Sequence, residues 1–86
     1  MTVSFHGSVQ EQVAGDTSFE VQDMQDVKTL IELLAAHYGE AFKEFLLGDD
    51  TCFFLVNGSG IMATGGLRTP LHDDDVVEVL PFVGGG

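Results

Sequence analysis

The segment between Asp26 and Gly39 constrains the fold most, because it holds the clearest helical pattern in the sequence. Apolar residues recur at steps of three and four from Val27 to Tyr38, which places them along one face of a helix. Asp26 is suited to accept a backbone hydrogen bond at the N-terminus, and Gly39 is suited to end the helix. The sequence therefore predicts one main helix from about Asp26 to His37, with an apolar face that another element must cover.

Four short segments around this helix have the patterns of strands. Apolar and polar residues alternate over residues 2–6 and again over 18–22, which predicts a hairpin. The apolar run at 52–56 is too short for a buried helix and predicts a strand that is covered on at least one face. Residues 76–80 predict a last strand, and residues 41–47 predict a second, shorter helix.

The connections contain strong turn signals. Residues 57–58 are Asn-Gly, the dipeptide best suited to a tight turn with positive φ, and three aspartates at 73–75 predict another turn. Residues 59–66 include three glycines and predict a loop or a weak edge strand. Residues 9–14 are expected to form a short helical turn or a wide loop.

This order of elements predicts an α+β fold in which one main helix packs on a mixed sheet of four or five strands. The last strand can lie beside the first, because it follows the turn at 73–75. The β-grasp, or ubiquitin-like, roll satisfies these constraints. A sequence of 86 residues suits one domain. We expect that domain over residues 1–81, followed by a flexible glycine tail at 82–86.

The charge of the chain limits its partners. Only three residues are Lys or Arg, against 14 Asp and Glu, so the net charge is -11 at pH 7. Nucleic acids and anionic membranes are bound through basic groups, so neither is expected as a partner. The same charge favours a partner with a basic surface. Because the sequence has no signal-peptide pattern and no apolar run of about 20 residues, we expect a cytoplasmic protein.

No set of side chains predicts a catalytic or metal site. The single cysteine, Cys52, begins an apolar run and is interpreted as a buried core thiol rather than a sulfur relay. His6, His37 and His72 lack the spacing of a zinc site, and the aspartates at 73–75 are interpreted as a solvated turn. We therefore expect no bound metal and no bound cofactor.

Three segments, taken in order, carry a more specific signal: LVNG at 55–58, TPLHDDDVV at 69–77 and PFVGGG at 81–86. Together they resemble the MoaD/ThiS family, the ubiquitin-like sulfur carriers of molybdenum cofactor and thiamine biosynthesis. The resemblance covers nearly the whole chain and is greatest to the small subunits of molybdopterin synthase. The usual ending of those subunits, Pro-Pro-Val-small-Gly-Gly, places Gly85 and Gly86 at the glycine pair.

Three positions depart from the family pattern. The family often has Asp-Gly-Asp before the last strand, where this chain has Asp74 at the glycine position; aspartate tolerates left-handed backbone less well than glycine does. Residues 10–12 are Gln-Glu-Gln, where the family often has Arg-Glu-Leu. The loop at 59–66 is longer and richer in glycine than in the synthase subunits, which raises the prospect of a different client.

The resemblance implies a carrier and not an enzyme. An E1-like enzyme would use ATP to adenylate the carboxylate of Gly86, and a sulfur donor would convert the adenylate to a thiocarboxylate. The sulfur would then pass to an acceptor, either the large subunit of molybdopterin synthase or another acceptor enzyme. No catalytic side chain is required of the chain itself, and ATP is used by the activating partner.

The resemblance also implies that an apolar sheet face beside the tail docks these partners. The six residues from Pro81 to Gly86 span at most ~20 Å, glycines thread a narrow tunnel, and Pro81 stiffens the exit. Core packing is the alternative role for each apolar residue, and Arg68 pairs either with a partner carboxylate or, as we favour, with nearby aspartates. The predicted partner-binding residues are Leu80, Pro81, Phe82, Gly84, Gly85, Ile61, Leu67 and Arg68.

Other functions remain open for such a chain. Within the same chemistry, the sulfur would serve thiamine, cysteine or tRNA thiolation. In a different class, the chain would be a ubiquitin-like binding module with an inert tail, or a modifier conjugated to protein lysines. The fate of the terminal carboxylate separates these alternatives.

Overall fold

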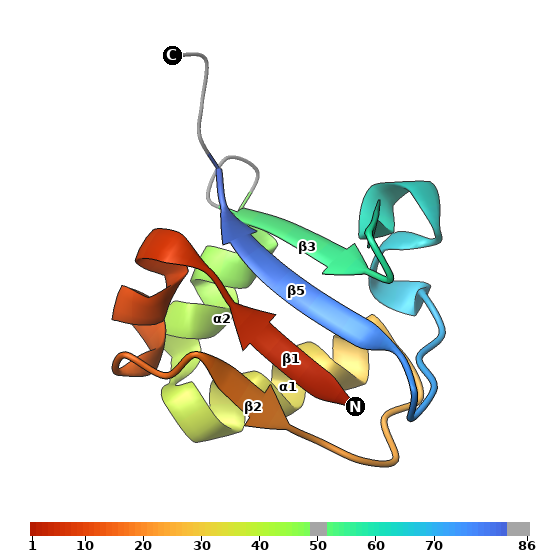
Figure 1. The fold of residues 1–86 in the computed structure, drawn as a ribbon, viewed down its shortest axis with the longest axis horizontal. Coiled ribbons are helices and arrows are strands. Elements are labelled where there is room, and N and C mark those ends of the chain that lie inside the picture. The colour runs from red at the N-terminus through yellow and green to blue at the C-terminus, as the bar shows by residue number, and fades with distance from the viewer. Residues whose placement is uncertain (49–51, 83–86) are drawn as a thin grey trace.

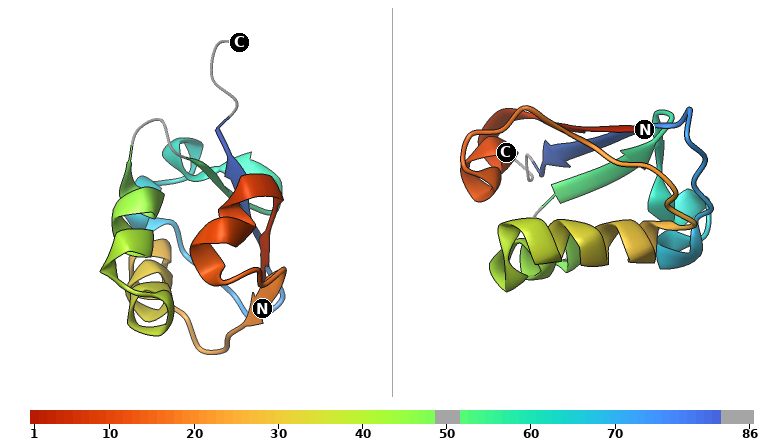
Figure 2. Two further views of the ribbon diagram at one scale, coloured as in Figure 1. Left: turned by 90° about the vertical axis from the view of Figure 1, so that its left-hand side faces the viewer. Right: turned by 90° about the horizontal axis from the view of Figure 1, so that it is seen from below.

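The computed structural model describes residues 1–48 and 52–82, which form a five-stranded sheet with the two α-helices on one of its faces (Figures 1 and 2). In chain order, the elements are β1 (Thr2–Phe5), the 3₁₀ helix η1 (Gly7–Val13), β2 (Ser18–Glu20), α1 (Val27–Tyr38), α2 (Glu40–Leu47), β3 (Cys52–Val56), β4 (Ser59–Gly60), the 3₁₀ turns η2 (Ile61–Ala63) and η3 (Gly66–Arg68), and β5 (Val76–Pro81). The sequence predicted this order, with the segment at 59–66 divided between a short edge strand and 3₁₀ turns.

The sheet has the strand order β2-β1-β5-β3-β4. The first and last strands, β1 and β5, are parallel neighbours at its centre, and the other pairs are antiparallel. The expected β-grasp roll with a mixed sheet is confirmed. Because β1 and β5 are parallel, their C-terminal ends lie at the same end of the sheet. The chain therefore leaves β5 beside the segment that follows β1 (Figure 1).

Helix α1 begins as its sequence predicts. The Oδ1 atom of Asp26 accepts hydrogen bonds from the backbone N–H and the hydroxyl of Thr29, at 2.8 and 2.7 Å. These bonds lower the pKa of Asp26, the backbone bond most strongly. On the apolar face, Val27, Leu30 and Leu34 are fully buried. This face packs against the inward side of the sheet, where the largest contribution comes from β1, β3 and β5.

The second helix is part of the core rather than an addition to it. Phe42 of α2 is buried and meets Phe5 of β1 edge to face, with ring centroids 5.9 Å apart. Tyr38, at the end of α1, meets both of these rings edge to face and donates a hydrogen bond to Oδ2 of Asp16 at 2.7 Å. Burial, together with this bond, raises the pKa of Tyr38 to about 12. One main helix on the sheet was expected. The core also requires α2, because Phe42 and Leu46 close one end of it.

The turn before β5 is tied to the turn after β3. Asn57 has a positive φ of 52°, as expected of its Asn-Gly dipeptide, and its side chain bonds to two groups. Its Nδ2 donates to Oδ1 of Asp75 at 2.9 Å, and its Oδ1 accepts from the backbone N–H of Val76 at 2.9 Å. The bond from Asn57, and then the backbone N–H of His72, lower the pKa of Asp75. Asp74 has no positive φ, so its departure from glycine causes no backbone strain.

We expect Asp75→Asn to reduce the free energy of unfolding by less than about 1 kcal/mol at neutral pH, because Asp75 is only partly buried and its bond to Asn57 lies at the surface. The folded-state pKa of Asp75 is lowered, so its contribution is present above the ordinary aspartate pKa of about 4 and is lost as the pH falls through the lower folded value. Urea unfolding of both proteins across this acid range measures the difference. The matched control is Asp74→Asn, because Asp74 makes no hydrogen bond to the described part of the chain. A pH-independent difference for Asp75→Asn would contradict this account.

Candidate functional site

The candidate site is the end of the sheet from which the C-terminal segment leaves. Strand β5 ends at Pro81, and Phe82 is the last described residue. The predicted tail residues Gly84, Gly85 and Gly86 lie outside the described residues. The structure therefore defines the base of the tail and the surfaces around it.

One apolar surface lies on the outer face of the sheet. Along β5, Val77 and Val79 are fully buried, so the residues between them face the other way. Leu80 is the cross-strand partner of Phe53, and the rings of Phe53 and Phe82 lie 5.3 Å apart. We call Phe53, Leu80 and Phe82 the outer patch. Phe53 is 49% exposed and Phe82 is 38% exposed, and neither α1 nor α2 covers this face (Figure 2).

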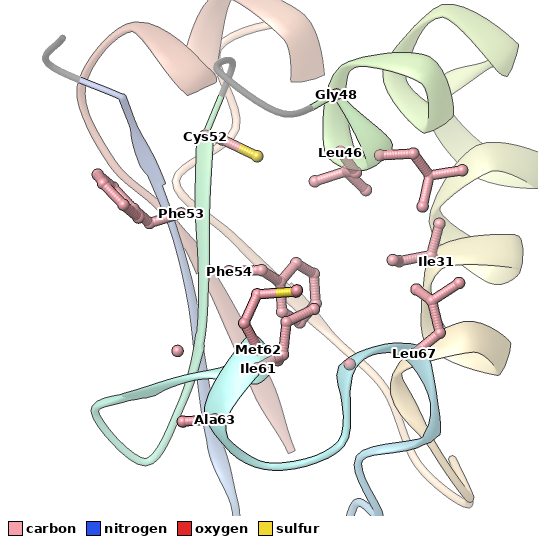
Figure 3. A pocket seen from close by; sticks show the side chains of 13 residues that line it. Ile31, Leu46, Gly48, Cys52, Phe53, Phe54, Ile61, Met62, Ala63 and Leu67 are labelled. Carbon is pink, nitrogen blue, oxygen red and sulfur yellow. The ribbon is translucent and has the colours of Figure 1, made fainter.

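A second apolar surface lies at the edge of the sheet, between β3, η2 and the helices (Figure 3). This edge groove has a volume of about 670 Å³, and none of the lining residues that the structure describes is charged. Figure 3 shows Cys52 pointing into the groove, while Phe53 points away from it and borders both surfaces. The main lining side chains are Ile31, Leu46, Phe54, Ile61, Met62 and Leu67.

The structure divides the single apolar face that the sequence predicted. Leu80 and Phe82 lie together on the outer patch, whereas Ile61 and Leu67 line the edge groove. Sequence reasoning missed Phe53, which joins the two surfaces. The signal was weak because residues 52–56 are all apolar and show no alternation. The register against β5, which pairs Phe54 with buried Val79, decides which of these side chains faces outward.

Arg68 does not pair with nearby aspartates, so the favoured prediction for it was wrong. It is exposed at the end of η3, beside Leu67, and forms no ion pair with Asp73, Asp74 or Asp75. Two of these aspartates are engaged elsewhere: Asp75 bonds to Asn57 and His72, and Asp73 accepts from the backbone N–H of Asp23 at 3.2 Å. The third, Asp74, is exposed and forms no ion pair with the described residues. Arg68 therefore presents its charge to solvent at the rim of the groove.

Cys52, expected to be a buried core thiol, is partly buried and packs against the hydrophobic core. Its Sγ lies 3.8 Å from the carbonyl oxygen of Phe45.

In residues 1–48 and 52–82, no group of three His, Cys, Asp or Glu side chains is arranged to hold a metal ion. No helix within those ranges is long and apolar enough to span a membrane.

A family model and several solved structures match this chain over nearly its whole length. The model of the ThiS family matches residues 3–86. A chain in the solved complex of subunits 1 and 2 of molybdopterin-converting factor from Helicobacter pylori is 32% identical, with a TM-score of 0.67. The match covers 99% of this chain and 96% of that one. No curated protein matches the sequence.

Two further structures are more similar in shape but less similar in sequence. A chain in the BexX/CysO complex of Amycolatopsis orientalis has a TM-score of 0.80 and is 25% identical, covering 99% of this chain and 98% of that one. Small archaeal modifier protein 1 from Methanosarcina acetivorans has a TM-score of 0.77 and is 27% identical, with coverage of 99% and 94%. All three comparisons extend over nearly the full fold, including the outer patch and the base of the tail.

Proposed function

The chain belongs to the ThiS family of ubiquitin-like sulfur carriers, and from that premise we propose that the carboxylate of Gly86 is the group that carries sulfur. The observation that carries the proposal is the family match itself, because it extends through residue 86 and so includes the three tail glycines. The arrangement at the base of the tail supports it. Strand β5 runs directly into the tail, and the outer patch lies where a partner holding the tail would dock.

The proposed cycle has three steps. The Gly86 carboxylate attacks the α-phosphate of ATP in an E1-like enzyme, which releases pyrophosphate and leaves an acyl-adenylate. A sulfide donor then displaces AMP and leaves a thiocarboxylate. An acceptor enzyme takes the sulfur into a small molecule, and water restores the carboxylate. The chain supplies the carrier group and the docking surface, and ATP belongs to the partner.

The acceptor that we propose is the large subunit of a molybdopterin synthase. The support is the 32% identity with a chain in the complex of subunits 1 and 2 of the converting factor from Helicobacter pylori. Structural similarity favours a second acceptor, one of the kind found with CysO, because the TM-score is higher with the chain in the BexX/CysO complex than with the chain in the converting-factor complex. Sequence and shape therefore point to different clients of one sulfur chemistry.

The test is the intact mass of the chain after incubation with ATP, an E1-like enzyme and sulfide. We expect the mass to increase by the difference between a sulfur atom and an oxygen atom. The loaded chain is then mixed separately with a molybdopterin synthase large subunit and with acceptors for cysteine, thiamine and tRNA thiolation. Rapid loss of the added mass with one acceptor identifies the client. An unchanged mass after activation would rule out the carrier function.

We expect Leu80→Lys to weaken the complex with the activating enzyme at least 10-fold, because a charge then lies at the centre of the outer patch. Val76→Lys is the matched control. Val76 lies on the same strand, is 51% exposed and is about 13 Å further from the tail, and the substitution changes the net charge equally. Isothermal titration calorimetry of both variants measures the effect. Equal weakening by the two substitutions would indicate that charge, and not the outer patch, governs docking.

A further inference from the structure

We propose that Gly7 is a positioning residue for the tail, a role that rests on the proposed function of Gly86. Because Gly7 has no side chain, the ring of Pro81 occupies the space beside it. This contact sets the direction in which the chain leaves the sheet. Gly7 lies far from Gly86 in the sequence and touches neither the sulfur nor a partner in this scheme.

The parallel pairing of the first and last strands brings the two residues together. β1 ends at Phe5, and the chain turns out of the sheet at Gly7, which has a φ of +57°. Just before this turn, the backbone N–H of His6 donates to the carbonyl oxygen of Val79 at 3.0 Å. Strand β5 continues past that bond to Pro81, so its last residue lies against the start of η1.

Proline suits position 81 because its nitrogen needs no hydrogen-bond partner on the side where β1 has ended. Backbone groups alternate in direction along a strand, so the nitrogen of Pro81 faces the same side as the carbonyl of Val79. On that side β1 has already ended, and proline has no N–H to satisfy. A Cβ on residue 7 would lie 3.1 Å from Cγ and 3.4 Å from Cδ of Pro81. The ring of Pro81 therefore takes the space that a side chain on residue 7 would need.

Of the two sides of this contact, η1 is the one held in place. Val9 and Val13 are fully buried, and Nε2 of Gln10 donates to the carbonyl oxygen of Phe5 at 3.0 Å. Pro81 is at the end of its strand and is only partly buried. A methyl group on residue 7 would therefore displace Pro81 rather than η1.

A small displacement at Pro81 is amplified along the tail. The five residues after Pro81 reach ~17 Å when extended. While a partner holds the tail extended, a rotation of about 10° at its base would move the carboxylate of Gly86 by about 3 Å. A misplacement of only about 1 Å from a reacting group costs roughly 100-fold in rate. Gly7 thus influences the reaction rate without contacting the reacting atoms.

The test compares Gly7→Ala with Gly15→Ala. Both glycines are exposed and have positive φ, so alanine causes similar backbone strain at both positions. A Cβ on residue 15 would have no atom within 4 Å, whereas one on residue 7 would meet Pro81. Pro81→Ala, alone and with Gly7→Ala, completes a double-mutant cycle that removes the ring from the contact.

We expect similar decreases in the urea midpoint for Gly7→Ala and Gly15→Ala. Only Gly7→Ala should lower kcat for ATP-dependent loading, at least 10-fold, with KM for the carrier changed less than 3-fold. In the Pro81→Ala background, Gly7→Ala should cost less than 3-fold in kcat. Equal kcat values for the two alanine variants, or a full loss of kcat in the Pro81→Ala background, would overturn the proposal.

A readout that needs no sulfur chemistry separates this inference from the proposed function. Residual dipolar couplings of the Phe82 amide report the direction of the chain after Pro81. We expect them to change in Gly7→Ala and not in Gly15→Ala, whether or not the chain is ever loaded with sulfur. If both variants keep the wild-type couplings, Gly7 does not set the direction of the tail.

Discussion

Deletion of Gly86 is expected to reduce ATP-dependent sulfur loading by at least about 1,000-fold. The shortened chain still ends in two glycines, so the loss is not a loss of the glycine pair. The carboxylate is instead drawn back from the partner's reacting groups by about 3.3 Å, the length of one extended residue. Because a misplacement of about 1 Å already costs roughly 100-fold, the shortened tail should be nearly inert. Pyrophosphate release measures the adenylation of the carboxylate, and the intact mass measures the exchange of oxygen for sulfur that follows.

The matched control is Gly84→Ala, which keeps the length of the tail and the terminal glycine pair. The family pattern accepts any small residue at this position, so loading should remain within about 3-fold of the wild type. Binding to the activating enzyme should survive the deletion, because the outer patch is unchanged. If the chain lacking Gly86 were loaded at the normal rate, the reacting carboxylate would not be that of residue 86.

Phe5→Ala is expected to lower the free energy of unfolding by about 3–5 kcal/mol. Phe5 is 1% exposed and contacts the rings of both Tyr38 and Phe42, so its removal leaves a cavity between the sheet and the two helices. A domain of this size has a total stability of roughly 5–15 kcal/mol. The variant should therefore be partly unfolded or close to it. Urea unfolding followed by circular dichroism measures the loss.

The same substitution on another strand is the control for Phe5→Ala. Phe53 is 49% exposed on β3, and Phe53→Ala should change the free energy of unfolding by less than about 1 kcal/mol. It should instead weaken the complex with the activating enzyme by about 2 kcal/mol, because it removes an aromatic side chain from the outer patch. A large loss of stability with unchanged partner affinity would show that Phe53 belongs to the core and that the outer patch is not a docking surface.

Local features of the fold were predictable because they depend on neighbouring residues. Asp26 caps α1 because its carboxylate reaches the N–H of Thr29, only three positions away. Asn57 turns with positive φ because its own side chain tolerates that conformation. The resemblance of the tail to a known family also resides in a short segment, and the family model bears it out through residue 86.

The arrangement of the docking residues was not predictable in the same way. Residues 52–56 carry no alternation, so only their register against β5 turns Phe53 outward and Phe54 inward. Arg68 was expected to pair with aspartates that are close in sequence, but Asp75 is held by Asn57 from another turn. Each outcome depends on a partner residue that is distant in the chain.

The sequence by itself determined the helix, the turns, the family and the three glycines of the tail, because each is written in contiguous residues. Tertiary structure alone decided what surrounds the base of that tail. The pairing of β1 with β5 joins the two ends of the chain and sets Gly7 against Pro81. It also leaves Leu80 on the outer face while Ile61 and Leu67 line the edge groove. The order of elements already predicted that the last strand lies beside the first, but the register of the strands, and with it the side chains that meet at the tail, is a long-range choice made by packing, so no local pattern contains it.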